Sequence, residues 1–485
     1  MASPAAKPKE VGFITSIQDY LLYLEGLPSV RVNDILICEN GARALVTALE
    51  REKVEAVMLD SARPKPGEAL SLSPSGLRIP QPNKLLGRAI TPTGDPLDGK
   101  PSLPPGGEAV DLDSIAGGVD TRRIITEQFV TGISMIDTLL PIGKGQRELI
   151  IGEPRGGKSS FILECINHQK GKNIVCVYAG IGKPEVETRR FIKSMQETNS
   201  LENAVIVAAS SNESAPLISI TPHIAISIAE YFAKGGTDVL LILDDLSTHS
   251  KYLREMALLS SRIPGRESYP ADIFYQHSHL VERAGCFNEK NGNASITLLP
   301  LVETDLESMT SFIPTNIMSM TDGHIFFSAS LRAQGQYPAV EPDRSVTRVG
   351  HQTQGVLHKQ LSDKLRTLLA DFHELEKYGH FGSELSADTQ ITINRGKILI
   401  EMLTQEPLQD IAIPVQIILL AIIFTPFCEA HDAEFIKRYK NVLLKLISES
   451  PEFAPVREKL KDYDIPTLFK VLSDMTPFLE KSCQI

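Results

Sequence analysis

The sequence lacks a long hydrophobic run, a paired cysteine motif and any tryptophan. Its most apolar stretch, QIILLAIIFTPF at 416–427, spans only twelve residues. A helix that crosses a bilayer needs about 20, so we interpret this stretch as a buried core helix. The six cysteines are far apart without a C-x-x-C pair, which argues against a disulfide framework or zinc site and favours reduced thiols. The first residues, MASPAAKPKE, show no signal or transit peptide pattern.

An excess of basic residues is also lacking. The 49 lysines and arginines are outnumbered by 60 acidic residues, which gives a net charge of −11. This balance argues against non-specific binding to nucleic acid or anionic membranes. We therefore expect no nucleic-acid partner, and membrane association only indirectly, through partner chains. The 485 residues have ordinary globular composition, and their number suggests about three domains.

Residues 1–79 contain short segments rich in β-forming residues, separated by turn residues such as Asn40-Gly41 and Pro66-Gly67. This pattern predicts a small antiparallel barrel or sandwich. Proline and glycine are then frequent from Arg78 to Gly117, which predicts a loop that leads into the next domain. The predicted strands are Val11–Ile17, Tyr20–Leu24, Asp34–Cys38, Ala42–Leu49, Lys53–Met58 and Ala69–Leu72.

From about Arg147 to Gly350 short apolar runs alternate with helical stretches, and this predicts an α/β domain with a mainly parallel sheet, which we assign to residues 80–355. From residue 356 to 485, apolar residues recur at helical spacing and predict an α-helical bundle. The central helices are expected at Ser159–His168, Pro184–Met195 and Pro222–Lys234. The central strands are expected at Glu148–Ile151, Asn173–Val177, Ala204–Ala208, Val239–Leu243, Ile296–Leu299 and Ile325–Phe327.

A phosphate-binding loop is predicted where GEPRGGKS, residues 152–159, follows one of these strands and precedes a helix. Glycines let backbone N–H groups surround a phosphate, and the helix offers its positive N-terminus. In such a loop the lysine neutralises phosphate charge and the serine hydroxyl binds Mg²⁺. The alternative is a glycine-rich turn with an exposed lysine. The residues predicted to bind ATP or ADP here are Gly152, Arg155, Gly156, Gly157, Lys158, Ser159 and Ser160.

The second half of a nucleotide site is an acidic residue after a buried strand. The run VLLIL at 239–243 ends at Asp244, which we predict to hold Mg²⁺ through water, opposite Ser159. Alone this signal is weak, because an aspartate often caps the helix that follows a strand. The histidines at 249, 277 and 279 lack acidic or cysteine companions and predict no metal site.

Several longer motifs resemble one family. The segments TGISMID (131–137) and PIGKGQR (141–147) resemble the approach to the phosphate loop in rotary ATPases. More specifically, the chain resembles the α subunits of F-type ATP synthases in six further motifs: DDLS (244–247), PGRESYP (264–270), DIFYQHS (272–278), IPTN (313–316), TDG (321–323) and SVTRVG (345–350). The resemblance implies an N-terminal barrel, a central nucleotide domain and a helical bundle. It also implies a ring of three α and three catalytic β subunits around a central shaft, the γ subunit.

Two positions decide the role that the resemblance implies. In catalytic β chains of the family a glutamate follows the glycine after the strand, whereas this chain has Gly182-Lys183-Pro184. A cation cannot accept a proton from water, so we predict a site that binds nucleotide without turning it over. Arg348 falls where the family carries an arginine finger that acts on the neighbouring β site. The nearby Arg344 is its competitor for that role, and an ordinary surface ion pair is the alternative.

Other positions depart from the family. The loop carries Glu153-Pro-Arg-Gly156 instead of Asp-Arg-Gln-Thr, and the adenine pocket carries Tyr337-Pro338 instead of Arg-Pro. The later glutamine pair is reduced to Gln405-Glu406. We expect adenine to contact Tyr337, Pro338 and Gln405. The family's α chains begin with a helix of about twenty residues before the barrel, but the first strand here is expected at Val11, so contact with the peripheral stalk is expected to differ or be absent.

We therefore predict a non-catalytic, nucleotide-binding α subunit of an F-type ATP synthase, in bacterial cytoplasm and attached peripherally to the inner face of the membrane through its complex. One alternative is a self-sufficient homohexameric ATPase motor for protein export or nucleic-acid translocation, which would need its own water-activating acid. Another is a scaffold that never binds nucleotide, which the intact Lys158, Ser159 and Asp244 argue against.

Overall fold

A computed structural model describes residues 10–483 except 52, 75, 105–106, 113, 306–307 and 380–386. The chain forms two compact units, each made of two stretches of sequence. The first unit is Met1–Ile124 with Gln169–Thr321, and the second is Ile125–His168 with Asp322–Ile485. Residues 1–9, predicted to carry no targeting pattern, lie outside the described residues. Among the residues described, no helix has the length and apolar character to cross a membrane.

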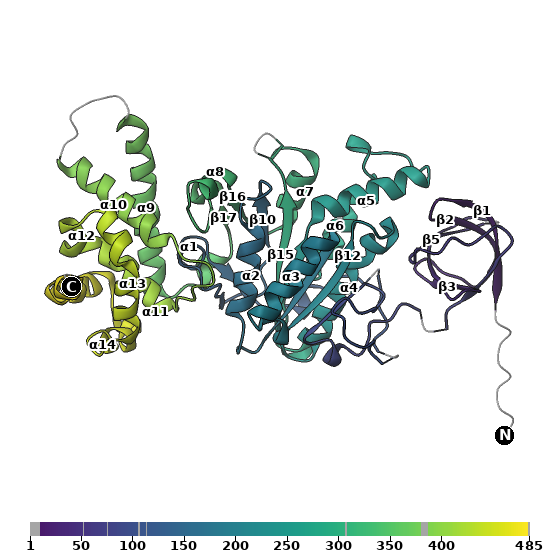
Figure 1. Cartoon of the computed structure of the whole chain (residues 1–485), viewed down its shortest axis with the longest axis horizontal. Coiled ribbons are helices and arrows are strands. Elements are labelled where there is room, and N and C mark those ends of the chain that lie inside the picture. Colours follow the sequence, from purple (N-terminus) through teal and green to yellow (C-terminus); the bar gives the residue numbers. More distant parts are fainter. Residues whose placement is uncertain are drawn as a thin grey trace, which may run out of the picture. The chain divides into compact units, whose positions relative to one another are not determined.

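The first unit begins with a closed antiparallel barrel, drawn in purple in Figure 1. Its strand order is β1-β2-β5-β4-β3-β6, and β1 pairs with both β2 and β6. The barrel forms because apolar residues alternate along the strands and point inward, as Ile14 of β1 does between the exposed Phe13 and Thr15. The strands are β1 (Val11–Gln18), β2 (Leu21–Gly26), β3 (Ile35–Cys38), β4 (Arg43–Leu49), β5 (Val54–Met58) and β6 (Ala69–Leu72).

The first unit also contains parallel strands in the order β15-β13-β11-β12-β7, with β14 antiparallel to β15. Strands β11, β12, β13 and β15 are buried over nearly their whole length, as expected for parallel strands covered on both faces. Helix α4 packs across β11, β12 and β13. These strands are β7 (Arg88–Ile90), β11 (Ile174–Lys183), β12 (Ala204–Ser210), β13 (Asp238–Asp244), β14 (Gly285–Cys286) and β15 (Ser295–Glu303).

The helices of the first unit connect these strands and include several short 3₁₀ turns. The α-helices are α3 (Glu185–Glu197), α4 (Ala215–Lys234), α5 (Leu246–Leu259), α6 (Ile273–Glu282) and α7 (Phe312–Met320). The 3₁₀ helices are η1 (Pro82–Lys84), η2 (Val119–Thr121), η3 (Ser200–Asn203), η4 (Arg266–Ser268) and η5 (Glu289–Asn291).

Two sequence predictions in this unit were wrong. The helix expected to begin at Pro222 begins at Ala215, because Ser214 caps it by accepting a hydrogen bond from the Leu217 N–H and a proline occupies the first turn. Pro222 lies inside the helix. The proline-rich stretch predicted as loop contains strand β7, which pairs with β12. Its three residues lie between prolines, and the strand is too short for an alternating pattern to be recognised.

The second unit combines a small set of strands with helices. Parallel strands β10 and β16 pair from Glu148 with Gly323 to Gly152 with Phe327, β17 pairs with β16, and β8 pairs with β9. The strands are β8 (Gln128–Phe129), β9 (Ile142–Gly143), β10 (Glu148–Gly152), β16 (Gly323–Phe327) and β17 (Val346–Thr347). The helices near them are α1 (Ser134–Leu139), α2 (Lys158–His168), α8 (Ala329–Ala333), η6 (Pro342–Arg344) and η7 (Gly350–Thr353).

The C-terminal part of the second unit is helical, as predicted (Figure 1). The apolar run at 416–427 is buried but is broken into two α-helices and a 3₁₀ turn, α11, η8 and α12. The elements are α9 (Val356–Gly379), α10 (Ala387–Leu403), α11 (Ile413–Ala421), η8 (Ile422–Phe424), α12 (Pro426–Ala430), α13 (Ala433–Glu449), α14 (Ala454–Glu458), η9 (Leu460–Asp462), α15 (Ile465–Asp474) and α16 (Thr476–Cys483).

A buried carboxylate organises the segment before β10. Asp137 accepts hydrogen bonds from the backbone N–H and hydroxyl of Thr131, both 2.8 Å, and from the Gly132 N–H at 2.9 Å. The Gln416 amide of α11 donates a further bond at 3.0 Å. Burial raises the pKa of Asp137, and these donors oppose that rise. The carboxylate thus ties the segment before α1 to the helical region.

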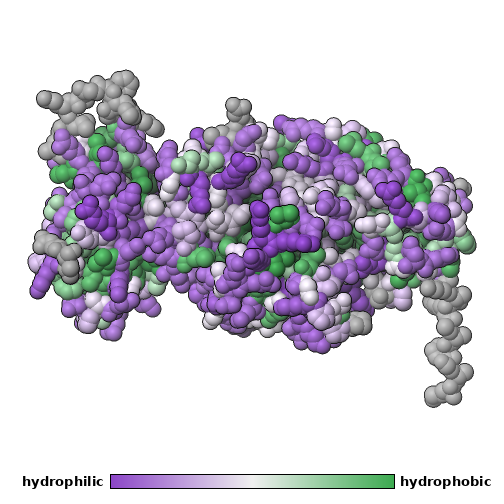
Figure 2. Space-filling view, viewed as in Figure 1, coloured by the Kyte–Doolittle hydropathy of each residue, from purple (hydrophilic) through white to green (hydrophobic). Residues whose placement is uncertain are grey.

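The predicted architecture is confirmed: an antiparallel barrel, a central region of mainly parallel strands with helices, and a C-terminal helical region. The six cysteines are buried and form no disulfide bond. Hydrophilic residues cover most of the face seen in Figure 2, with smaller hydrophobic areas among them. The boundaries 1–79, 80–355 and 356–485 stay a prediction.

Candidate functional site

The predicted phosphate loop connects strand β10 to helix α2 in the second unit. Gly152 has a φ of +153°, and a Cβ at this position would lie 2.1 Å from the carbonyl oxygen of Phe327. Only glycine lets β10 and β16 approach this closely at the start of the loop. Gly157 has a φ of +99°, and Arg155 also has a positive φ, of +64°. The loop is therefore a curled backbone of the kind that surrounds a phosphate.

The cationic and hydroxyl groups of the loop occupy the first turn of α2. The buried Lys158 donates from Nζ to the carbonyl oxygens of Gly152 at 2.9 Å and Glu153 at 2.7 Å, which holds its ammonium against the loop. Ser159 is exposed, and with the described residues its side chain forms no hydrogen bond. Its hydroxyl therefore fits the predicted role of a Mg²⁺ ligand. Ser160 is half-buried, and Arg155 is exposed.

Helix α2 also reaches the predicted adenine residues. Glu164 accepts hydrogen bonds from the Tyr337 hydroxyl and from the Leu408 N–H, the latter at 3.0 Å. Burial raises the pKa of Glu164. The Arg332 guanidinium lies 4.8 Å from the centre of the Tyr337 ring and covers one of its faces. Tyr337 is thus fixed by a cation–π contact on its ring and a hydrogen bond from its hydroxyl.

Tyr337 and Gln405 line a cavity of about 520 Å³ in the second unit. The Gln405 side chain accepts a hydrogen bond from the Ser134 N–H at 3.0 Å and donates to the Gly132 carbonyl at 2.8 Å. Pro338 is buried beside Tyr337. The cavity is large enough for a nucleoside, and we expect the predicted adenine contacts there. It is lined by Arg332, Gly335, Gln336, Tyr337, Glu401, Thr404, Gln405, Glu406, Pro407, Gln409, Lys437, Lys440 and Asn441.

Asp244 and Lys183 lie in the first unit, at the ends of the neighbouring strands β13 and β11. Lys183 Nζ is 2.7 Å from Oδ1 of Asp244 and 3.2 Å from Oδ2 of Asp245. Burial alone would lower the pKa of Lys183, but the two carboxylates outweigh it and hold the pKa above its ordinary value. The lysine is therefore a charged partner of the acid that was predicted to hold Mg²⁺.

Tyr178 completes the contacts of Asp244. Its hydroxyl donates to Oδ2 of Asp244 at 2.8 Å, while its ring stacks on Phe191 of α3 with centroids 4.3 Å apart. Burial raises the pKa of Tyr178, so the hydroxyl keeps its proton. Burial also raises the pKa of Asp244, and Lys183 offsets part of that rise. The two oxygens of Asp244 thus each have a partner in this unit, and the residue fits a Mg²⁺ site less well than Ser159 does.

Arg348 follows β17 and lies in the second unit. Its backbone N–H donates to the Asp322 carbonyl at 3.3 Å. The side chain is exposed and makes no hydrogen bond or ion pair with the described residues. Arg344, in contrast, is paired with Glu341 at 3.2 Å. An exposed guanidinium of this kind is able to reach a neighbouring chain.

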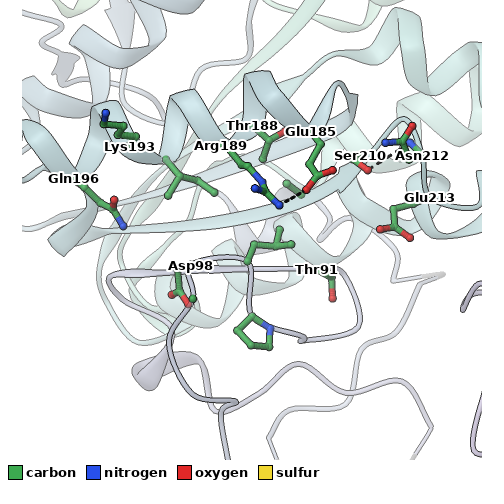
Figure 3. Close-up of a pocket in the computed structure, with 15 residues that line it drawn as sticks. Thr91, Asp98, Glu185, Thr188, Arg189, Lys193, Gln196, Ser210, Asn212 and Glu213 are labelled. Carbon is green, nitrogen blue, oxygen red and sulfur yellow. Dashed lines mark hydrogen bonds and ion pairs between the residues drawn. The ribbon is translucent and has the colours of Figure 1, made fainter.

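The acids that follow Lys183 are at the start of α3, beside a cavity of about 580 Å³. Figure 3 shows Glu185 turned along the helix toward Arg189, with which it forms an ion pair. Thr91 and Asp98 come from the facing loop. Because the Glu185 carboxylate is paired with the Arg189 guanidinium, it is a poor candidate for activating water. Acidic residues at a helix N-terminus also stabilise the helix.

His249 of α5 and His277 of α6 form a buried pair, and His249 also contacts the backbone of α4. His249 Nδ1 is 3.1 Å from His277 Nε2, and His249 Nε2 is 2.9 Å from the Ser219 carbonyl oxygen. Burial lowers the pKa of His249 to about 4 and that of His223 to about 3. Among the described residues, no group of three or more His, Cys, Asp or Glu side chains is arranged to hold a metal ion.

Sequence reasoning missed Glu164, Arg332 and Tyr178. Glu164 carried a signal, since it is an acid among apolar residues such as Phe161 and Cys165 of the predicted helix. Arg332 and Tyr178 carried none, because their contacts join residues that are distant in sequence. The structure brings the loop, Tyr337, Pro338, Gln405 and Arg348 into one unit, and Asp244 with Lys183 into the other.

Comparison with known proteins identifies the family. Residues 132–347 match the nucleotide-binding domain of the ATP synthase alpha/beta family, and residues 354–465 match the C-terminal domain of the ATP synthase alpha/beta chain. ATP synthase subunit alpha of Mycoplasmoides gallisepticum is 38% identical over 92% of this chain and 87% of its own length. Subunit alpha of Clostridium kluyveri is 38% identical over 84% of this chain and 81% of its own length. Subunit alpha of Mesomycoplasma hyopneumoniae is 35% identical over 97% and 94%. The chain therefore belongs to the ATP synthase alpha/beta family, and the three relatives named above are alpha subunits.

Proposed function

We propose that this chain is a non-catalytic, nucleotide-binding α subunit in the head of an F-type ATP synthase. It would alternate with catalytic β subunits in a ring of three and three around a γ-subunit shaft, and couple ATP synthesis or hydrolysis to rotation of that shaft. The observation that carries the proposal is Lys183, which occupies the place of a water-activating carboxylate and pairs with Asp244 and Asp245.

The chemistry of hydrolysis supports this assignment. A general base must accept a proton from the attacking water, and a charged ammonium has no lone pair to do so. The nearby Glu185 is paired with Arg189. The chain's own site is therefore suited to holding a nucleotide and poorly suited to cleaving it.

Nucleotide binding is assigned to the loop and to the cavity beside Tyr337. Lys158 and the backbone of the loop would bind the phosphates of ATP or ADP, and Tyr337, Pro338 and Gln405 would contact adenine. Mg²⁺ would be held by the Ser159 hydroxyl and would neutralise phosphate charge when bound. Asp244 stays a weaker candidate for this ion.

Arg348 is proposed as an arginine finger for the β subunit's site. Its exposure, and the lack of hydrogen bonds or ion pairs with the described residues, support a role toward a neighbouring chain. A guanidinium supplied in trans stabilises charge on the transferred phosphoryl group and accelerates the reaction by about 10³–10⁵-fold. Attachment to the membrane of a bacterial cell would come through the complex, and a different peripheral-stalk contact stays a prediction.

The test compares the purified chain alone with the chain assembled with its β partner. We expect the chain alone to bind ATP with negligible hydrolysis, and the mixture to hydrolyse ATP. Arg348→Ala should leave nucleotide binding by the chain intact while lowering turnover of the assembled ring about 10³-fold or more. Arg344→Ala is the matched control and should leave turnover nearly unchanged.

Retained turnover in the Arg348→Ala ring would contradict the finger assignment. Robust hydrolysis by the chain alone would contradict the non-catalytic assignment and favour the homohexameric motor.

A further inference from the structure

The Gln405 amide, which is expected to contact adenine, already has partners for both of its donor hydrogens. Its Nε2 donates to the Gly132 carbonyl oxygen at 2.8 Å and to that of Gln409, while Oε1 accepts from the Ser134 N–H at 3.0 Å. An amide recognises adenine by accepting from N6 and donating to N7 at the same time. Gln405 has no hydrogen left for the second of these bonds.

A buried ammonium lines the same cavity of about 520 Å³. Lys440 of α13 is 7% exposed, and its Nζ donates to the Glu401 carbonyl oxygen at 2.9 Å. A lysine carries three donor hydrogens, and its hydrogen bonds with the described residues use one of them. Burial lowers the pKa of Lys440 to about 8, although the charges of Glu401 and Glu406 oppose this. Lys440 is therefore a desolvated cation at neutral pH, and it gains from any acceptor that enters the cavity.

The other cations that line the cavity, Arg332 and Lys437, gain less from such an acceptor. The Arg332 guanidinium lies 4.8 Å from the centre of the Tyr337 ring. Lys437 is exposed, so water already satisfies its ammonium. An acceptor group on a ligand is therefore best placed against Lys440.

The acidic residues of the cavity do not decide between the two purines. Glu401 and Glu406 both line it, and Oε1 of Glu406 accepts from the Asn441 amide at 3.0 Å. A carboxylate accepts a hydrogen bond from the exocyclic amine of either base, N6 of adenine or N2 of guanine. Discrimination therefore falls to the donors.

The cavity lies next to the phosphate loop in the same unit. A Cβ built at Gly157 of the loop would lie 3.9 Å from Cδ of Arg332, which lines the cavity. Helix α2, which follows the loop, contacts the cavity where Glu164 accepts a hydrogen bond from Tyr337. The cavity is thus placed to receive the base of a nucleotide whose phosphates the loop binds.

We propose that Lys440 recognises the base of the bound nucleotide, and that the cavity binds guanine nucleotides as tightly as adenine nucleotides or more tightly. Guanine presents two neighbouring acceptors, O6 and N7, and a lysine donates to both. Adenine presents a donor, N6, beside N7, and this edge suits an amide of the kind that Gln405 has committed to the backbone. The inference rests on the proposed nucleotide binding and assigns the base selectivity of that site.

The test measures binding of ADP, GDP and 7-deaza-GDP to the full chain by titration calorimetry in excess MgCl₂. We expect the dissociation constant for GDP to be no more than about threefold above that for ADP. 7-deaza-GDP has a C–H group in place of N7 and cannot accept a hydrogen bond there. It should therefore bind about fivefold or more weakly than GDP.

Two variants assign the effect to one residue. Lys440→Gln replaces the ammonium with an amide, which suits the edge of adenine rather than that of guanine. Its affinity for GDP should fall about tenfold or more, while its affinity for ADP changes by less than about threefold. Lys445→Gln is the matched control, because Lys445 is an exposed lysine of the same helix outside the cavity. It should leave both affinities unchanged.

Each outcome has a distinct meaning. A dissociation constant for GDP more than about threefold above that for ADP would overturn this inference and leave the proposed nucleotide binding standing. Unchanged affinity for GDP in a Lys440→Gln variant that folds, as judged by circular dichroism, would also overturn it. If that variant does not fold, the unmodified chain decides, and equal binding of GDP and 7-deaza-GDP would overturn the inference. Failure to bind either ADP or GDP would overturn the proposed nucleotide binding, and this inference with it.

Discussion

His249→Gln should make the first unit less sensitive to acid. His249 is buried between its hydrogen-bonding partners His277 and the Ser219 carbonyl oxygen. Burial lowers its pKa to about 4, although the Ser219 carbonyl and the Asp245 charge oppose this. In the unfolded chain the pKa returns to about 6.5. A proton therefore binds the unfolded chain first as the pH falls, and stability is lost below about pH 6.5.

The size of the effect follows from these two values. Between pH 7.5 and pH 5 the unfolded imidazole becomes almost fully protonated, while the folded one stays neutral. Proton linkage then costs the folded state about 2 kcal/mol. Glutamine stays uncharged throughout this range and keeps an amide for the Ser219 carbonyl. We therefore expect His249→Gln to lose about 2 kcal/mol less stability than the unmodified chain over the same interval.

The assay is urea unfolding followed by circular dichroism at pH 7.5 and pH 5. Unfolding free energy falls by about 3 kcal/mol per molar urea. The urea midpoint of His249→Gln should therefore shift by about 0.7 M less between the two pH values than that of the unmodified chain. Buried acids with a raised pKa, such as Glu148, have the opposite effect and stabilise the folded chain as the pH falls. They are common to both chains and cancel in the comparison. His279→Gln is the control, since the His279 ring lies tilted against Tyr275, outside the buried pair of His249 and His277. Equal midpoint shifts in the unmodified chain and His249→Gln would refute the reasoning.

Two further substitutions test the second unit. Gly152→Ala should abolish nucleotide binding, because the new methyl would lie 2.1 Å from the Phe327 carbonyl oxygen. Calorimetry should show normal binding for the control Gly355→Ala, where an added methyl meets no atom within 4 Å. Retained binding by Gly152→Ala would contradict this packing. Asp137→Ala should lower the free energy of unfolding by about 3–5 kcal/mol, because it leaves several buried donors without a partner. Thermal unfolding measures this loss, and a change below about 1 kcal/mol would count against the role assigned to the carboxylate.

The parts of the fold that the sequence predicted well are those in which local signals agree. The strand predicted at Val11–Ile17 is β1, Val11–Gln18, because β-forming residues end at a turn. The start of α4 was misplaced because Pro222 resembles a helix start, whereas Ser214 and Pro216 supply an earlier one. Two local signals competed there, and only the packing of the helix shows which is used.

The chemistry of the candidate site was predicted by residue type, but its contacts were not. Strand β12 lies between β11 and β13 in the sequence, yet β11 and β13 are neighbours, and Gly180 is in register with Asp244. This neighbour relation is what brings Lys183 to Asp244. The hydrogen bond between Tyr337 and Glu164 similarly joins residues 173 positions apart. Pairings of this kind depend on topology, which a single sequence does not encode locally.

The closure of the N-terminal barrel has a consequence for assembly. Because β1 pairs with β6, the ladder from Val11 to Leu72 returns on itself and, within the described residues, leaves no open strand edge. An incoming chain cannot extend this sheet by strand addition, so a neighbour must recognise the barrel through side chains and turns. Phe13, on the outer surface of β1, is an exposed apolar side chain of the kind that such recognition would use. Any assembly contact through the barrel would then be controlled by surface substitutions, and the closed sheet is protected from edge-to-edge polymerisation.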